Sequence, residues 1–144
     1  MTESLASARL WLAFLTYALA RQACRKGYRA LYRRASRLFH ELTLARADGS
    51  CVRVLGRLAR TDVLVIDDWG LVPVQDQERR DLLEILEDRD GTRSTIITSQ
   101  LPPAQWHDYL GDATLADAIC DRSCTTHRLV LKGPSRRKET KLDS

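Results

Sequence analysis

The stretch Thr61-Asp62-Val63-Leu64-Val65-Ile66-Asp67-Asp68-Trp69-Gly70 decides the fold that we expect for this chain of 144 residues. Residues 63–66 are consecutive apolar residues, mostly β-branched, and they have no polar face. They are too few for a helix and predict a strand that is covered on both sides. Such a strand can place Asp67 and Asp68 only at its C-terminal edge, which is where open α/β sheets bind their ligands.

The adjacent carboxylates of Asp67 and Asp68 repel each other unless a cation or strong hydrogen-bond donors lie between them. The pair therefore indicates a divalent metal ion, most simply Mg²⁺ beside a phosphate group. A short acidic motif has many false positives, so a second interpretation stays open. In that interpretation the two residues merely begin a turn that ends at Gly70.

The composition is that of a single soluble globular domain, with 44% hydrophobic and 29% charged residues. The net charge of +4 is unevenly distributed. Residues 1–60 carry twelve Lys or Arg against three acidic residues, whereas residues 61–131 carry six against fourteen. This asymmetry fits a polyanion on one surface and a metal site on another, although solvated helix faces produce similar counts.

The four cysteines, Cys24, Cys51, Cys120 and Cys124, form no pair of CxxC units, and the chain is not rich enough in cysteine to need a disulfide framework. We expect reduced thiols and a cytoplasmic protein. The apolar run between Arg9 and Arg21 is too short to span a membrane and lacks the positive start of an export signal. We interpret it as part of a largely buried helix over residues 5–26.

The rest of the pattern predicts alternating helices and strands. Strands are expected over 28–33, 94–98 and 127–131, and helices over 35–47, 51–60, 104–109 and 115–122. A further helix should begin at Gln75 or Asp76 and end at Asp90-Gly91. This alternation predicts a parallel sheet with helices on both faces. Residues 132–144 read as a polar, basic tail.

Polar residues also follow the strand over 94–98, where Thr98 leads into Ser99 and Gln100. In a parallel sheet this tip would lie beside the Asp67-Asp68 tip. The combination suggests a nucleotide hydrolase in which the second tip orients the attacking water.

Three segments together resemble the IstB-like ATP-binding proteins: residues 62–71, residues 77–89 and residues 94–102. Residues 115–122 and 131–133 continue the resemblance, which extends from about Trp11 to Lys138. These proteins are transposition helper ATPases related to the DnaC-like helicase loaders, within the AAA+ class of P-loop NTPases. The resemblance implies ATP and Mg²⁺ as cofactors. It also implies a transposase and double-stranded DNA as partners, and a homo-oligomer.

The resemblance also implies roles for individual residues. Asp67 would help hold Mg²⁺ and Asp68 would polarise the water that attacks the γ-phosphate, while Thr98, Ser99 or Gln100 would take the sensor role. Arg122 matches the arginine finger, which acts on ATP bound to the adjacent subunit. These roles fit the chemistry, because phosphoryl transfer depends on positioning and on neutralising spread-out negative charge.

The chain departs from the family pattern where the phosphate-binding loop is expected. It contains no GxxxxGK[ST] motif, and Ala8-Arg9-Leu10 stands where the family has Gly-Lys-Ser/Thr before Trp11. We therefore expect an α/β fold with a three-layer P-loop NTPase (AAA+) core that lacks the first strand and the phosphate-binding loop. Residues 1–131 would form this partial ATP-binding domain, restarted after a lost N-terminal segment and impaired in ATP hydrolysis. Arg122 precedes a segment that is one residue shorter than the family pattern.

An alternative hypothesis is a nucleotide-independent fragment that binds DNA or a partner protein. Its basis is a set of basic residues that could neutralise phosphates, namely Arg33, Arg34, Arg37, Arg136, Arg137 and Lys138. A solvated basic face would explain the same residues.

Overall fold

The computed structural model describes the backbone of residues 2–123 and the side chains of residues 11–123. Its elements follow the chain order α1 (Thr2–Arg25), β1 (Ala30–Arg34), α2 (Ala35–Asp48), α3 (Cys51–Arg60), β2 (Val63–Trp69), α4 (Asp76–Arg89), β3 (Ser94–Ser99), α5 (Pro103–Leu110) and α6 (Ala113–Ser123). The expected strand over 127–131 and the tail over 132–144 lie outside the described residues. Every other expected element is confirmed, with ends that differ by a few residues.

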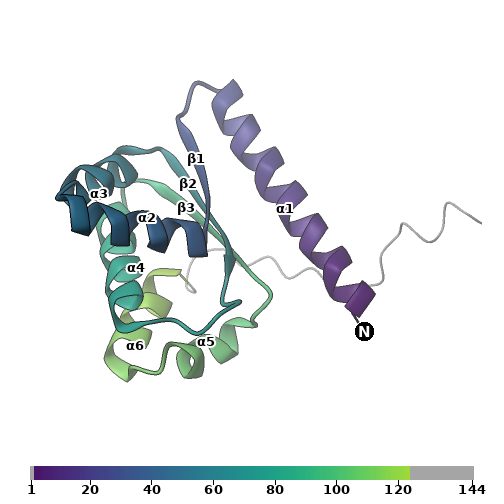
Figure 1. The fold of residues 1–144 in the computed structure, drawn as a ribbon. Helices are drawn as coiled ribbons and strands as arrows, with labels where there is room; N and C mark the ends of the chain where they lie inside the picture. The colour runs from purple at the N-terminus through teal and green to yellow at the C-terminus, as the bar shows by residue number, and fades with distance from the viewer. Residues whose placement is uncertain (1, 124–144) are drawn as a thin grey trace, which may run out of the picture.

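The three described strands form one parallel sheet in the order β1-β2-β3. Parallel neighbours require crossover connections, which α2 with α3 and α4 provide. Figure 1 shows α2, α3 and α4 on one side of the sheet and α1 on the other, so that helices cover both faces as predicted. The fold is that of the expected three-layer α/β core.

The core lies between the sheet and the helices α2, α4, α5 and α6. Strand β2 supplies Leu64 and Ile66, neither of which is exposed, and α2 supplies Leu38 and Leu42 at helical spacing. Near the C-terminal end of β2 the core is aromatic, because Trp69 makes edge-on contacts with three aromatic rings, those of Phe39, Trp106 and Tyr109. This packing fixes the end of the central strand.

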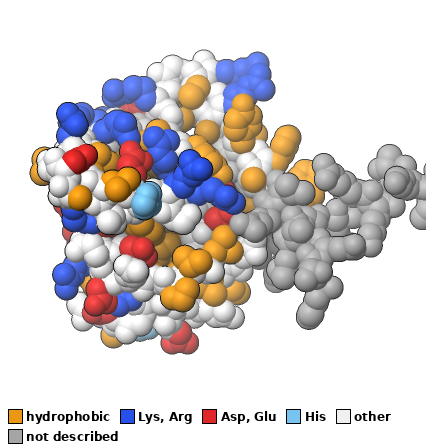
Figure 2. All heavy atoms as spheres, viewed as in Figure 1, with side chains coloured by type: hydrophobic (Ala, Val, Ile, Leu, Met, Phe, Trp, Pro, Cys, Tyr) orange, Lys and Arg blue, Asp and Glu red, His pale blue; other side chains and the backbone are white. Residues whose placement is uncertain are grey.

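The expectation that the first helix is largely buried is wrong. In α1 the side chains of Trp11, Phe14 and Tyr17 are 49%, 66% and 63% exposed, whereas Thr16 is buried. Figure 2 shows hydrophobic side chains along the surface where α1 lies. An apolar pattern shows only which residues could be buried. Helix α1 contacts the sheet with one side, and within the described residues no second layer covers its other side. No helix among residues 2–123 is long and apolar enough to cross a membrane.

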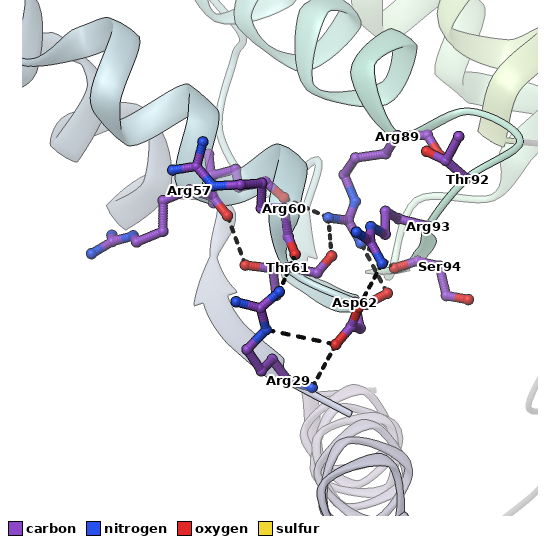
Figure 3. Close-up of polar contacts among 10 residues, drawn as sticks. Arg29, Arg57, Arg60, Thr61, Asp62, Arg89, Thr92, Arg93 and Ser94 are labelled. Carbon is purple, nitrogen blue, oxygen red and sulfur yellow. Dashed lines mark hydrogen bonds and ion pairs between the residues drawn. The ribbon is translucent and has the colours of Figure 1, made fainter. Parts of the chain in front are cut away.

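At the end of the sheet where the strands begin, α4 is held by Arg89, which is 1% exposed. Figure 3 shows Arg89 reaching from the end of α4 toward Thr61 and Asp62 at the start of β2. Its guanidinium donates to the carbonyl oxygens of Leu58 at 2.5 Å, Thr61 at 2.6 Å and Ser94 at 2.5 Å. Burial, followed by the charge of Arg93, lowers the pKa of Arg89. The carbonyl oxygens at the end of α3 offset the cost of this buried charge.

Asp62, the residue directly before β2, belongs to the same cluster (Figure 3). Its carboxylate accepts the main-chain N–H of Arg29 at 2.9 Å and the guanidinium of Arg93 at 2.7 Å. The Arg29 N–H is the largest cause of a lowered pKa for Asp62, with Arg93 and Arg29 side chains adding to it. These polar groups connect the starts of β1, β2 and β3. The candidate binding site lies at the opposite end of the sheet, where the strands end.

Candidate nucleotide site at the C-terminal edge of the sheet

The two carboxylates lie at an irregular point of the β2–β3 pairing. The register shifts between Ile66 and Trp69, so that Asp67 and Asp68 face a single residue of β3, Thr98. Asp68 has a φ of 58°, a left-handed conformation that is uncommon outside glycine. Because of the extra residue, both Ile66 and Trp69 point into the core, and both carboxylates lie outside it. The sequence predicts the acidic pair but not this bulge.

Asp67 is buried, with an exposed fraction of 5%. The hydroxyl group of Thr98 donates to its Oδ1 and the hydroxyl group of Tyr32 donates to its Oδ2. Two neutral donors from the two neighbouring strands therefore stabilise this carboxylate. Burial and then the hydrogen bond with Asp67 raise the pKa of Tyr32 to about 12.

Asp68 lies closer to solvent than Asp67 and has a different kind of partner. The Arg34 guanidinium is 2.9 Å from its Oδ2. Its main-chain N–H donates to Oγ1 of Thr98 at 3.1 Å. The two adjacent carboxylates thus avoid mutual repulsion by turning to different partners.

Ser99 and Gly70 bring the two strand tips together. Ser99 donates from Oγ to the carbonyl oxygen of Trp69 at 2.6 Å and accepts the N–H of Leu101 at 3.0 Å. Gly70 has a φ of 88°, and a β-carbon at this position would lie 3.2 Å from Cβ of Leu101. The close approach therefore requires glycine. Gln100 follows Ser99 and is partly exposed at the same edge.

A cavity of about 230 Å³ adjoins this edge on the side of α2. The first turn of α2 borders it, and Arg34, Asp68, Trp69 and Tyr109 are among its other lining residues. The first turn of α2 has no side-chain cap and no acidic residue.

Arg122 does not reach this site within the described chain. It lies on α6, where its guanidinium is 3.2 Å from Glu87 and donates to the carbonyl oxygen of Ala118 at 3.0 Å. Glu87 belongs to the last turn of α4, next to the cluster around Arg89 at the other end of the sheet.

The basic candidates have separate environments. Arg33 is 3.3 Å from Glu41, Arg34 is bound to Asp68, and Arg37 is exposed on α2. Figure 2 shows Lys and Arg side chains gathered across the part of the surface where α2 lies. The candidates Arg136, Arg137 and Lys138 lie outside the described residues.

Two residues important to the site could not be identified from the sequence. Tyr32 has no motif around it, and only the strand register brings its hydroxyl group to Asp67. Arg34 is a candidate DNA contact in the sequence, but in the structure it is the ionic partner of Asp68. Knowledge of the register would have suggested both, because Arg34 pairs with Asp67 and Tyr32 is two residues earlier on the same face.

The oxygen atoms of this site suit Mg²⁺ as it is usually bound beside phosphates. Mg²⁺ prefers oxygen ligands, keeps several waters and needs only one or two protein carboxylates. Asp67, Asp68 and the Thr98 hydroxyl offer such oxygens within one strand-tip cluster. Among residues 11–123, no group of three or more His, Cys, Asp or Glu side chains could enclose a metal ion on its own. A metal here would therefore depend on phosphate and water for its remaining ligands.

Comparison with known proteins identifies relatives for nearly the whole chain. The family model described as IstB-like ATP binding protein matches residues 9–144. An insertion sequence ATP-binding protein of Sinorhizobium fredii, y4pL, is 50% identical over 132 residues, which are 91% of this chain and 54% of that protein. The IS1162 ATP-binding protein of Pseudomonas fluorescens is 56% identical over 85 residues, or 59% of this chain and 37% of that protein. The chain spans about half the length of y4pL.

Solved structures support the fold. The AMPPCP-bound DnaA of Aquifex aeolicus superposes with a TM-score of 0.55 at 18% identity, over 58% of this chain and 27% of that one. A replication initiator DnaA bound to AMPPCP and single-stranded DNA gives a TM-score of 0.61 at 17% identity, over 69% of this chain and 31% of that one. These likenesses show that the chain shares the α/β fold of these structures.

Proposed function

Because the chain belongs to the IstB-like ATP-binding protein family, we propose that it assists DNA transposition as an ATP-dependent helper of a transposase. The observation that carries this proposal is the joining of the Asp67-Asp68 tip to the Thr98 tip at the ligand-binding edge of a parallel sheet. This arrangement supports the binding of nucleotide phosphates together with a divalent cation.

Each strand-tip residue has a task in this proposal. Asp67 would hold Mg²⁺, and the ion would neutralise the phosphate charge when bound. Asp68 orients the attacking water, with its backbone fixed by Thr98. Thr98, Ser99 and Gln100, at the tip of the neighbouring strand, take the sensor role toward the γ-phosphate. Positioning of this kind accounts for most of the catalysis in phosphoryl transfer.

ATP binding and hydrolysis by this chain are proposed to be weak. Ala8-Arg9-Leu10 lacks the glycine, the compact lysine ammonium and the Mg²⁺-binding hydroxyl that a phosphate-binding loop supplies. Cleavage would also need a second subunit, because Arg122 points to Glu87 and not to Asp68 of its own chain. We therefore propose a homo-oligomer in the cytoplasm, with the transposase and double-stranded DNA as further partners.

The experiment that tests this proposal measures ATP binding to the purified chain by calorimetry, with and without Mg²⁺. We expect weak ATP binding that depends on Mg²⁺ and is lost in Asp67→Ala. Asp62→Ala is the matched control, because Asp62 is an acidic residue of the other edge. Mg²⁺-dependent binding that survives Asp67→Ala would contradict the proposal.

A second candidate function is nucleotide-independent DNA binding. The observation that favours it is the band of basic side chains over α2, in which Arg37 is exposed. Such a surface binds phosphates with an affinity that falls steeply as salt concentration rises. Duplex DNA affinity measured at two salt concentrations tests it, and an affinity that does not change with salt would exclude an electrostatic DNA surface.

A further inference from the structure

Tyr32 reaches the buried carboxylate of Asp67 from the outer strand of the sheet. In the β1–β2 register Tyr32 pairs with Val65 and Arg34 pairs with Asp67, so Tyr32 lies diagonally across from Asp67 on the same face. Diagonal neighbours are within reach of long aromatic side chains. The phenol hydroxyl uses this reach to donate to Oδ2.

With Tyr32 in place, both oxygens of Asp67 are occupied. Thr98 donates to Oδ1 from the opposite strand, and the exposed fraction of Asp67 is only 5%. Neutral hydroxyl groups and not cations provide both contacts, since the neighbouring guanidinium of Arg34 is paired with Asp68. Both carboxylate oxygens of Asp67 are thus hydrogen-bonded and buried before any cation binds.

The two contacts on Asp67 differ in how easily they can open. Thr98 is buried, with 6% of its surface exposed, and its hydroxyl group also accepts the N–H of Asp68. Tyr32 is 40% exposed, and its hydroxyl group has Asp67 as its one hydrogen-bond partner within the described residues. Of the two contacts, the one from Tyr32 is therefore the easier to open, because its ring is partly exposed and its hydroxyl group makes a single hydrogen bond.

We propose that Tyr32 is a latch on Asp67, and that a divalent cation reaches Oδ2 only when the phenol hydroxyl leaves it. This inference rests on the proposed function, because it assumes that Asp67 is the cation-binding carboxylate. It adds a competition between a residue of β1 and the cation. The latch keeps the carboxylate hydrogen-bonded while the cation is absent, which limits the cost of burying its charge.

The test is binding of Mn²⁺, an oxygen-binding substitute for Mg²⁺ whose free concentration is measured by electron paramagnetic resonance. A constant concentration of inorganic phosphate is present throughout, because a metal at this site depends on phosphate and water for its remaining ligands. The full chain is compared with Tyr32→Phe, which keeps the ring and removes the hydroxyl group. Tyr28→Phe is the matched control, since Tyr28 is 56% exposed on the connection before β1. Asp67→Asn identifies the part of the binding that depends on this carboxylate.

We expect Tyr32→Phe to bind Mn²⁺ at least about tenfold more tightly, the effect of removing one competing hydrogen bond to a charged group. Tyr28→Phe should match the unchanged chain. Should Tyr32→Phe fail to fold, as judged by circular dichroism, Tyr32→Leu removes the same hydroxyl group and should show the same tightening.

Two results would overturn the latch, and they differ in what they leave standing. Equal Mn²⁺ affinity in Tyr32→Phe and the unchanged chain, with loss of binding in Asp67→Asn, refutes the latch and leaves the proposed cation role of Asp67 intact. Binding that is independent of Asp67 in every variant, or the absence of Mn²⁺ binding in all of them, refutes the cation role and the latch with it.

Discussion

The hydroxyl group of Thr98 donates a hydrogen bond to Oδ1 of Asp67 and so joins the tips of β3 and β2. Its oxygen also accepts the main-chain N–H of Asp68 at 3.1 Å. One side chain therefore satisfies a buried carboxylate and the backbone of the bulge beside it. Valine, which has the same shape as threonine but no hydroxyl group, could serve neither role.

Replacing Thr98 by valine should destabilise the protein without changing the shape of the side chain. Asp67 would lose a donor and the N–H of Asp68 an acceptor, at a cost of about 1–3 kcal/mol in the free energy of unfolding. Urea denaturation measures this cost. Thr98→Ser should restore most of the stability, and Thr114→Val, at an exposed position of α6, should have almost no effect. Equal stability of Thr98→Val and the unchanged chain would contradict the observed contacts.

Arg89 should be among the most sensitive residues of the chain. Substitution by methionine keeps much of the volume but leaves the carbonyl oxygens of Leu58, Thr61 and Ser94 without their donor. The free energy of unfolding should fall by about 3 kcal/mol or more. Arg93→Met removes a half-exposed partner of Asp62 and should cost no more than about 1 kcal/mol. Similar decreases in the free energy of unfolding for Arg89→Met and Arg93→Met would argue against a buried Arg89 guanidinium bound to carbonyl oxygens.

Phe14 tests the exposure of α1. Its side chain is 66% exposed, so Phe14→Ser should change the free energy of unfolding by no more than about 0.5 kcal/mol. Leu42→Ala is the comparison, because Leu42 is fully buried in α2 and its truncation should cost about 2–5 kcal/mol. A large decrease in the free energy of unfolding in Phe14→Ser would mean that the side of α1 that carries Phe14 is covered and not exposed.

The ionisation of Tyr32 gives a pH-dependent prediction. Its pKa is raised to about 12 from the ordinary value of 10.0, so the folded chain retains this proton at pH values where the unfolded chain loses it. The resulting stabilisation is fully present below about pH 10 and is lost as pH rises to about 12. Ultraviolet titration of phenolate should show a tyrosine with a pKa of about 12 that is missing in Tyr32→Phe. In Asp67→Asn its pKa should move back toward 10. An unchanged pKa in Asp67→Asn would rule out Asp67 as a cause.

Much of the architecture could be predicted from residue patterns. The β-branched runs at 63–66 and 94–98, each with a breaker after it, predicted two neighbouring strands and a shared polar edge. The capping of α4 was also predictable, and Glu78 does accept the N–H of Gln75 at 3.1 Å. Local rules of this kind need no knowledge of distant contacts.

What the sequence could not predict depends on register and on covering layers. The bulge at Asp67 and Asp68 arises because Ile66 and Trp69 both pack into the core, and periodicity alone would place Asp68 beside Ile66 on that face. The Tyr32 contact follows from the same register. The exposure of α1 depends on what packs against its outer side, which its apolar residues do not specify.

The most direct test of the nucleotide site is the location of the backbone amide signals that move when ATP and Mg²⁺ are added to the isotope-labelled chain. We expect the largest NMR shifts on Asp67, Asp68 and Gly70 of the first tip and on Thr98 and Ser99 of the second. Shifts concentrated on α3 or on the Arg89 cluster, with these five amides unmoved at saturating nucleotide, would contradict it.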